Sequence, residues 1–105
     1  MLKEEKILQA LGFDLPVTCL DVTDSTDLRL KERCRAGDRR VQLLCADSQT
    51  AGRGRLGRNF LSPEGTGIYM SLLLPLPEDG LPLTIRAAVA VCRTVEEVCG
   101  LSLKI

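Results

Sequence analysis

The sequence has no histidine and no tryptophan, and aromatic residues make up only 3% of its 105 residues. Histidine and cysteine are the usual ligands of zinc, and the five cysteines show no CxxC spacing, so we expect no metal site. No apolar run approaches the ~20 residues that a membrane span needs, and the charged N-terminus does not resemble a signal peptide. The 14 basic and 14 acidic residues balance, which argues against a bulk nucleic-acid binder. We therefore expect a small cytoplasmic globular protein with no membrane association.

The cysteines are expected to be reduced, structural thiols, as is usual in the cytosol. Cys92 and Cys99 lie seven residues apart. This helical spacing predicts that both are buried as small apolar residues.

Apolar periodicity predicts helices that alternate with strands. We expect helices over 2–11, 24–37 and 83–100, each followed or closed by a glycine, and strands over 16–22, 41–47, 67–76 and 101–105. The run GIYMSLLLPL at 67–76 is so apolar that it predicts a strand buried on both faces. The fold class is therefore α/β or α+β, with no internal repeat and no second domain.

The segment QTAGRGRLGRNFLSPEGTG, residues 49–67, combines three arginines with five glycines. Glycine lets the backbone approach a ligand closely, and guanidinium groups suit carboxylate and phosphate oxygens. The segment is not a Walker A motif, because no Gly-Lys-Ser/Thr closes it and no helix follows. We interpret it as a loop that is mobile when free and that orders around a bound anion.

The same segment carries a resemblance. GRGRLGRNFLSPEGTGIYMSLLL, from Gly52 onward, resembles the signature of biotin–protein ligases, and DSTD at 24–27 is similar to that family's Ser-Thr-Asn motif. The resemblance covers about residues 15–105. It implies a mixed β-sheet flanked by helices, as in the biotin/lipoate ligase catalytic domain, whose fold is like that of class II aminoacyl-tRNA synthetases.

The resemblance implies the candidate site residues. Ser25, Thr26 and Gln49 match residues that contact biotin in the family. Asp27 stands where the family usually has asparagine, and an ionised aspartate can only accept hydrogen bonds, so its role as a biotin-binding residue is in doubt.

The arginine loop supplies the remaining candidates. The resemblance implies that Arg53, Gly54 and Arg55 contact biotin and the adenylate, with the two arginines as the catalytic groups. Gly52, Gly57 and Arg58 are expected to support loop closure or to contact phosphate. In this chemistry the biotin carboxylate attacks the α-phosphate of ATP, and fixed cations reduce the repulsion between the two anions.

The resemblance also implies the cofactors and partners. ATP, Mg²⁺ and biotin are the expected cofactor and substrates, and the acceptor is a lysine of a biotin carboxyl carrier protein. The family pattern continues with a Lys-Trp-Pro-Asn-Asp segment that LSLKI at 101–105 does not reach. We therefore expect residues 1–14 to be a helical lead-in and 15–105 to be the first half of a truncated catalytic domain that is inactive alone. No DNA-binding domain is expected in this chain, and the full-length protein could form a homodimer.

Blander interpretations stay open from the residues alone. Ser25 and Thr26 are common helix-capping residues, Tyr69 suits a structural role at the floor of a pocket, and Phe60 suits a core anchor or a wall of the adenylate site. The parent protein could also be a relative that binds biotin or its adenylate without transferring it. A third alternative is a Gly/Arg nucleic-acid-binding module, against which the neutral charge and the few aromatics weigh.

Overall fold

The computed structural model describes residues 1–76, 78 and 82–104. The chain forms two compact units, Met1–Leu74 and Pro75–Ile105. The described elements of the first unit are α1 (Glu4–Leu11), β1 (Val17–Thr23), α2 (Thr26–Arg35), β2 (Gln42–Gln49), a short 3₁₀ turn η1 (Arg55–Gly57) and β3 (Tyr69–Leu73). The second unit holds α3 (Leu83–Cys99).

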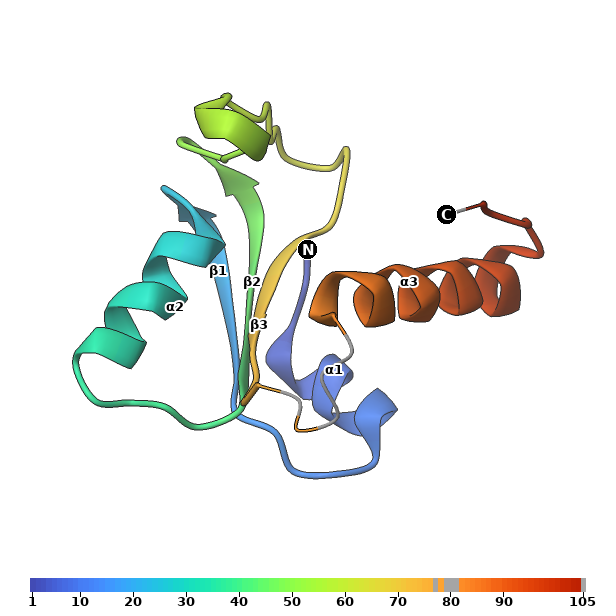
Figure 1. Ribbon diagram of the computed structural model, residues 1–105, viewed down its shortest axis with the longest axis horizontal. Helices are drawn as coiled ribbons and strands as arrows, with labels where there is room; N and C mark the ends of the chain where they lie inside the picture. Colours follow the sequence, from blue (N-terminus) through green and yellow to red (C-terminus); the bar gives the residue numbers. More distant parts are fainter. Residues whose placement is uncertain (77, 79–81, 105) are drawn as a thin grey trace. The chain divides into compact units, whose positions relative to one another are not determined.

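The first unit is built on a three-stranded sheet in the order β1-β2-β3. The strands β1 and β2 are parallel and are joined through α2, whereas β2 and β3 are antiparallel (Figure 1). Cys19, Cys45 and Met70 lie in register across the three strands. The sheet is therefore mixed and flanked by helices, as expected.

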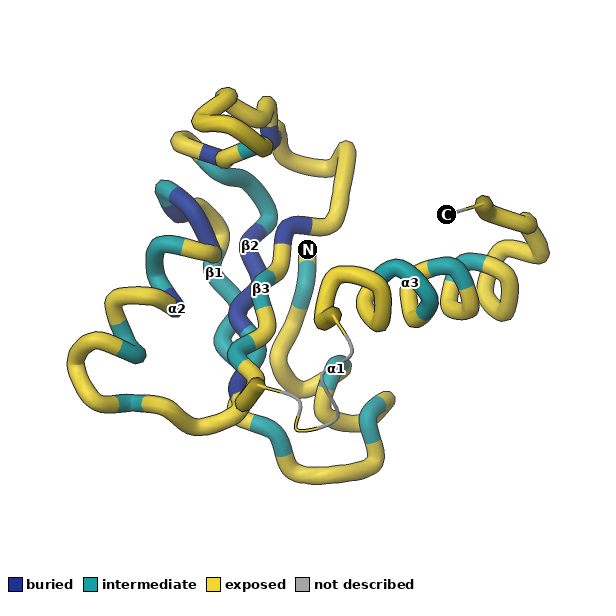
Figure 2. The backbone as a smooth tube through the Cα atoms, viewed as in Figure 1, coloured by how far each residue is buried: buried dark blue, intermediate teal, exposed yellow. Residues whose placement is uncertain are grey.

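The helix α2 packs on one face of the sheet, and α1 lies on the opposite side (Figure 1). Leu30 of α2 and Leu44 of the central strand are buried, with relative exposures of 4% and 0%. Most of the fully buried residues follow β2 and the loop base beyond it (Figure 2). The small core is therefore centred on β2, and the candidate site lies at the end of that strand.

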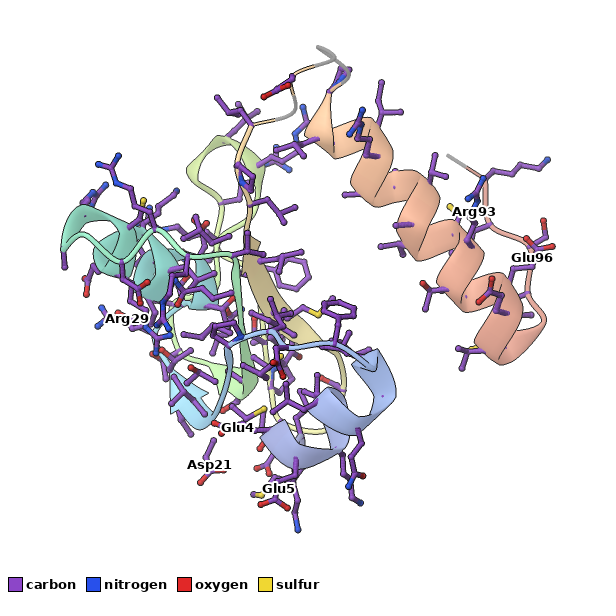
Figure 3. All side chains as sticks on the ribbon, turned by 90° about the horizontal axis from the view of Figure 1, so that it is seen from below. Glu4, Glu5, Asp21, Arg29, Arg93 and Glu96 are labelled. Atoms are coloured by element: carbon purple, nitrogen blue, oxygen red, sulfur yellow. The ribbon has the colours of Figure 1, made fainter. Side chains whose placement is uncertain are left out.

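The N-terminal segment makes one hydrogen bond with each of the strands β1 and β2. The Cys19 backbone N–H donates to Glu4 Oε1 at 3.0 Å, and the Leu2 N–H donates to Asp47 Oδ1 at 3.1 Å. Glu4 lies at the start of α1, next to the sheet (Figure 3). A carboxylate that accepts an edge N–H removes a donor with which another strand could pair.

The predicted glycine stops of α1 and α3 and the cap of α2 are confirmed, whereas α2 ends at Arg35, with Ala36 as its C-cap, before the predicted stop at Gly37. Gly12 and Gly100 end α1 and α3 in the left-handed conformation, with φ of 70° at both. Ser25 is the N-cap of α2, and its side chain accepts from the Leu28 N–H at 3.4 Å. Each glycine stop works because only glycine adopts this conformation without a steric cost.

Two strand predictions are wrong. The strand β3 is shorter than 67–76, and it is not buried on both faces, because Met70 and Leu72 are 57% and 48% exposed. Residues 101–104 form no strand, because a strand requires a partner and the described residues offer none there. Ile105 lies outside the described residues, as do residues 77 and 79–81.

The prediction that the cysteines are free thiols is confirmed for all five. The prediction that Cys92 and Cys99 are both buried is wrong, because Cys92 is half-buried and Cys99 is exposed. Both lie on α3, and its unit contains no second described helix or strand to cover an apolar stripe. Among the described helices, none is both long and apolar enough to cross a membrane.

Candidate ligand site

The candidate site lies where two parallel strands end at the same edge of the sheet. Thr23, the last residue of β1, lies in register with Gln49, the last residue of β2. The helix α2 begins three residues after Thr23, so its first turn lies beside the end of β2. Ser25, Thr26 and Gln49 are therefore brought together by topology, although Gln49 lies 23 residues from Thr26 along the chain.

The turn that holds Ser25 is fixed by Asp24. Its Oδ1 accepts from the Ser25 N–H at 2.7 Å and from Thr23 Oγ1 at 3.2 Å, and its Oδ2 lies 2.9 Å from the Arg29 guanidinium. These bonds, led by that from the Ser25 N–H, lower the pKa of Asp24 below its usual value. Arg29 extends from α2 (Figure 3) and also contacts Glu32, so it braces this turn against the helix.

The Gln49 side chain joins the start of α2 to the arginine loop. Its Oε1 accepts from the Thr26 N–H at 2.9 Å and from Thr26 Oγ1 at 3.2 Å. Its Nε2 donates to Ser62 Oγ at 3.0 Å. Thr26 and Ser62 are 4% and 2% exposed, so these bonds are shielded from water and hold the amide in one orientation.

The arginine loop is hydrogen-bonded at its base and along its length. The N–H groups of Thr50 and Ala51 donate to the carbonyls of Thr23 and Asp24, at 2.9 and 2.8 Å. Further along, the Phe60 N–H donates to the Gly52 carbonyl at 2.7 Å. The loop thus has a defined frame, while its predicted mobility stays a prediction.

The tip of the loop is a two-residue turn. Arg53 pairs with Asn59, and the Gly54 N–H donates to the Arg58 carbonyl at 2.7 Å. Between them, Leu56 and Gly57 both have positive φ, of 59° and 71°. This is the backbone of a type I′ turn, which suits hairpins but favours asparagine or glycine at both central positions.

Gly52 has a steric role that its flexibility alone did not predict. A Cβ atom on Gly52 would lie 2.6 Å from both the Phe60 carbonyl oxygen and Ser62 Oγ, and 3.0 Å from Gln49 Nε2. Gly52 is buried, so these neighbours cannot easily yield. The residue therefore lets the two sides of the loop base meet around the Gln49 amide.

The three loop arginines are exposed. Among the described residues, the side chains of Arg53, Arg55 and Arg58 make no hydrogen bond and no ion pair. By contrast, Arg29, Arg33 and Arg40 each contact an acceptor within the fold. The loop guanidinium groups are thus available to an anion from outside the chain.

A cavity of about 250 Å³ joins the two parts of the site. Its lining includes five of the predicted residues, namely Ser25, Thr26, Asp27, Gln49 and Arg53. Gly54, Arg55, Gly57 and Arg58 lie further out along the loop and do not line it, and Gly52 lies on the other side of Gln49 in a second cavity.

The cavity also contains residues that sequence reasoning placed elsewhere or missed. Phe60 is 57% exposed and lines the cavity, so the prediction of a core anchor is wrong, and its role as a wall of the adenylate site stays a prediction. Tyr69 is buried with its hydroxyl donating to the Pro63 carbonyl at 2.9 Å, as expected of a structural residue. Ser71 was not predicted, and only its alternation with apolar neighbours in β3 could have suggested an inward side chain.

Asp27 lies at the outer rim of this cavity. Its carboxylate contacts Lys31 Nζ at 2.9 Å, one helical turn along α2, and both side chains are 53% exposed. In the described part of the chain, no three Cys, Asp or Glu residues gather into a group that could hold a metal ion.

Comparison with known proteins gives the class of this chain. The model of the Biotin/lipoate A/B protein ligase family matches residues 19–103, which is most of the sequence, and the chain belongs to that family. The Bacillus subtilis bifunctional ligase/repressor BirA is 43% identical over 84 residues, covering 77% of this chain and 26% of that protein. The Escherichia coli BirA is 37% identical over 82 residues, covering 70% and 24%.

Solved structures place the fold among the biotin protein ligases. The biotin protein ligase from Aquifex aeolicus, in complex with biotin and ATP, is 35% identical with a TM-score of 0.69, covering 86% of this chain and 38% of that one. The Leishmania major enzyme in complex with biotin is 33% identical with a TM-score of 0.66, covering 82% and 36%. The chain thus spans about a quarter of the length of the curated relatives that it matches.

Proposed function

We propose that the full-length protein is an ATP-dependent biotin–protein ligase. It would convert biotin to biotinyl-5′-adenylate and then transfer the biotinyl group to a lysine of a biotin carboxyl carrier protein. The observation that carries the proposal is one cavity with two chemically different ends, one formed by Thr26 and Gln49 and the other by Arg53. Relatives in complex with biotin, and with biotin and ATP, support the same assignment.

The two ends suit the two ends of biotin. The Thr26 hydroxyl and the Gln49 amide are neutral hydrogen-bonding groups, which match the neutral urea ring. The Arg53 guanidinium is charged and has no partner among the described residues, which matches the carboxylate of the biotin tail. Biotin would therefore bind with its ring toward α2 and its carboxylate toward the loop.

The arginine loop then explains the chemistry of the first step. A carboxylate oxygen of biotin attacks the α-phosphorus of ATP, and the bond to the bridging oxygen breaks to release pyrophosphate. Both reactants are anionic, so unpaired guanidinium groups at Arg53 and Arg55 would offset their repulsion and the charge that develops in the transition state. Mg²⁺ would neutralise the phosphates of ATP, and we assign no residue of the described chain to bind it.

The second step uses the same intermediate. The amine of the acceptor lysine attacks the acyl carbon of the mixed anhydride, and AMP leaves. A loop that closes over the anhydride would protect it from water until the acceptor arrives. A cytosolic location, which suits the five free thiols, belongs to the same proposal.

The test is calorimetric titration of the full-length gene product with biotin in the presence of ATP, followed by the rate of adenylate formation. Arg53→Ala and Arg55→Ala are each expected to slow adenylate formation by about 10²–10³-fold, the usual effect of losing one transition-state donor. Folding should be unaltered, because neither side chain bonds to a described residue.

Arg40→Ala is the matched control, since Arg40 is exposed and its side chain pairs, among the described residues, with Asp38 alone, in the turn before β2. Adenylate formation at the wild-type rate in both loop variants would contradict the role of the arginines. A wild-type protein that binds no biotin, but binds RNA in a salt-sensitive manner, would instead support the nucleic-acid alternative.

A further inference from the structure

Two serine hydroxyls outside the predicted site are bonded to its central residues. Ser71 Oγ of β3 lies 2.8 Å from Thr26 Oγ1, and Ser62 Oγ, beyond the arginine loop, lies 3.0 Å from Gln49 Nε2. The four side chains form one continuous series across three separate segments. Each hydroxyl carries only one hydrogen, so the direction of every bond in the series can be worked out.

The direction is fixed first at Ser62. The Phe60 carbonyl can only accept, so the Ser62 hydroxyl donates its one hydrogen to it, with 3.1 Å between Ser62 Oγ and the carbonyl oxygen. Ser62 Oγ must then accept from Gln49, which places Nε2 on the side of Ser62. The backbone N–H of Thr26 can only donate, which independently places Oε1 on the opposite side.

The direction passes from Gln49 to Ser71 through Thr26. Gln49 Oε1 carries no hydrogen, so Thr26 Oγ1 donates in their 3.2 Å contact. The geometry of the 2.8 Å contact between Thr26 Oγ1 and Ser71 Oγ allows either hydroxyl to donate, and with the hydrogen of Thr26 placed on Gln49 the donor is Ser71. The lone pairs of Ser71 Oγ are left for the cavity, which Ser71 lines.

We infer that Ser62, Gln49, Thr26 and Ser71 form one directed hydrogen-bond chain that sets the polarity of the site, with Ser71 as an additional acceptor for an N–H of the ligand ring. The inference rests on the proposed function. A urea ring offers two N–H donors and one carbonyl acceptor, and Ser71 Oγ in the cavity lining offers an acceptor for one of those N–H groups. A dithiolane ring such as that of lipoate offers neither group, so the chain would favour the biotin class of substrate.

The test is the binding of biotin to the full-length gene product and to its Ser71→Ala and Ser62→Ala variants. Each variant is expected to weaken biotin binding by about tenfold, the usual effect of one lost buried hydrogen bond, with ATP binding unchanged. KM for biotin should rise while KM for ATP stays constant, and Ser71→Thr should restore binding because it keeps the hydroxyl. Ser71→Cys, a weak hydrogen-bond former of similar shape, replaces Ser71→Ala if the alanine variant does not fold.

The double variant distinguishes a chain from two independent contacts. Ser62 and Ser71 share no bond, so independent effects would multiply to about a hundredfold. We expect a clearly smaller combined loss of biotin affinity, because either substitution alone already lets the Gln49 and Thr26 side chains change orientation. Ser48→Ala is the matched control. The Ser48 hydroxyl donates to the Asp21 carbonyl of β1, and Ser48 does not line the cavity.

The outcomes separate this inference from the proposed function. A wild-type protein that binds no biotin would overturn the proposed function and the inference with it. A wild-type protein that binds biotin, with equal affinity in Ser71→Ala, would overturn the inference alone. Fully multiplicative effects in the double variant would show that the hydroxyls act separately and would also overturn it.

Discussion

The two ends of the candidate site differ in how completely the fold satisfies their polar groups. At the α2 end, Thr26 and Gln49 are bonded within the protein, and Ser25 and Ser62 beside them are buried. At the loop end, Arg53 and Arg55 are exposed and contact no described partner. The first end is organised before any ligand arrives, whereas we expect the second to be completed by a bound anion. The comparison suggests that recognition of the ring and catalysis on the carboxylate are separable by mutation.

The largest expected effect on stability comes from Gly52, which lies at the base of the arginine loop beside the Gln49 amide. Gly52→Ala would place a Cβ 2.6 Å from the Phe60 carbonyl and from Ser62 Oγ. We expect a loss of about 1–3 kcal/mol in the free energy of unfolding, as for other overpacked buried sites. Biotin binding should weaken as well, because the added Cβ would displace the Gln49 amide from its hydrogen bond with Ser62. Urea unfolding and calorimetry of the full-length gene product measure the two effects.

Gly54→Ala is the matched control for this prediction. A Cβ on Gly54 would lie 3.5 Å from its nearest neighbour, the Arg58 carbonyl, and φ there is −97°, which any residue adopts. Its stability should stay close to that of the wild type. Equal stability of Gly52→Ala and the wild type would show that the loop base is loose, and the two ends of the site would then be less different than the structure indicates.

Sequence reasoning was most successful where the signal is local. The cap at Ser25 and the stops at Gly12 and Gly100 depend only on neighbouring residues, and the structure confirms them. Burial of β3 was predicted wrongly, because an apolar run does not show whether another layer covers both faces of a strand. Residues 101–104 were predicted wrongly for a similar reason, since strand pairing depends on distant residues.

The candidate site shows the same difference between features with a local sequence signal and features that depend on distant residues. The GRGRLGR motif identified the arginines, and the family resemblance identified Ser25, Thr26 and Gln49. No local pattern indicated that Ser71, 45 residues from Thr26, would bond to its hydroxyl. The steric requirement at Gly52 was also hidden, because it depends on where Phe60 and Ser62 return to the loop base.

A smaller effect is expected at Leu56, which probes the loop end alone. Leu56 has a φ of 59° in the turn at the tip, a conformation that costs a leucine about 1–2 kcal/mol. It is 94% exposed, so little packing offsets this cost. Leu56→Asn should therefore raise the free energy of unfolding by about 1 kcal/mol. Urea unfolding measures the gain, and biotin binding at the α2 end should be unaltered.

Leu61→Asn serves as the control for Leu56. Leu61 is 87% exposed in the same segment but, unlike Leu56, it does not have a positive φ. The Leu61 variant should gain no stability. A loss of adenylate formation in Leu56→Asn, with stability raised as expected, would show that the leucine side chain itself serves the loop, and it would make the strain at the tip part of the function.

The smallest expected effect is at Asp24, which braces the α2 end alone. Bonding from the Ser25 N–H lowers the pKa of Asp24 in the folded state, so its contribution to stability is present above its unfolded pKa and is lost as pH falls through the lower, folded value. Asp24→Asn should be slightly less stable than the wild type at pH 7, and the difference in stability should shrink as the pH falls below about 4, the usual pKa of an unfolded aspartate. Urea midpoints at several pH values measure this difference.

Asp21→Asn is the control, since among the described residues the Asp21 side chain makes no hydrogen bond or ion pair. A gap for Asp24 that stays constant with pH would mean that the carboxylate charge does not hold the turn, and the α2 end would then owe its order to Gln49 and the two serines alone.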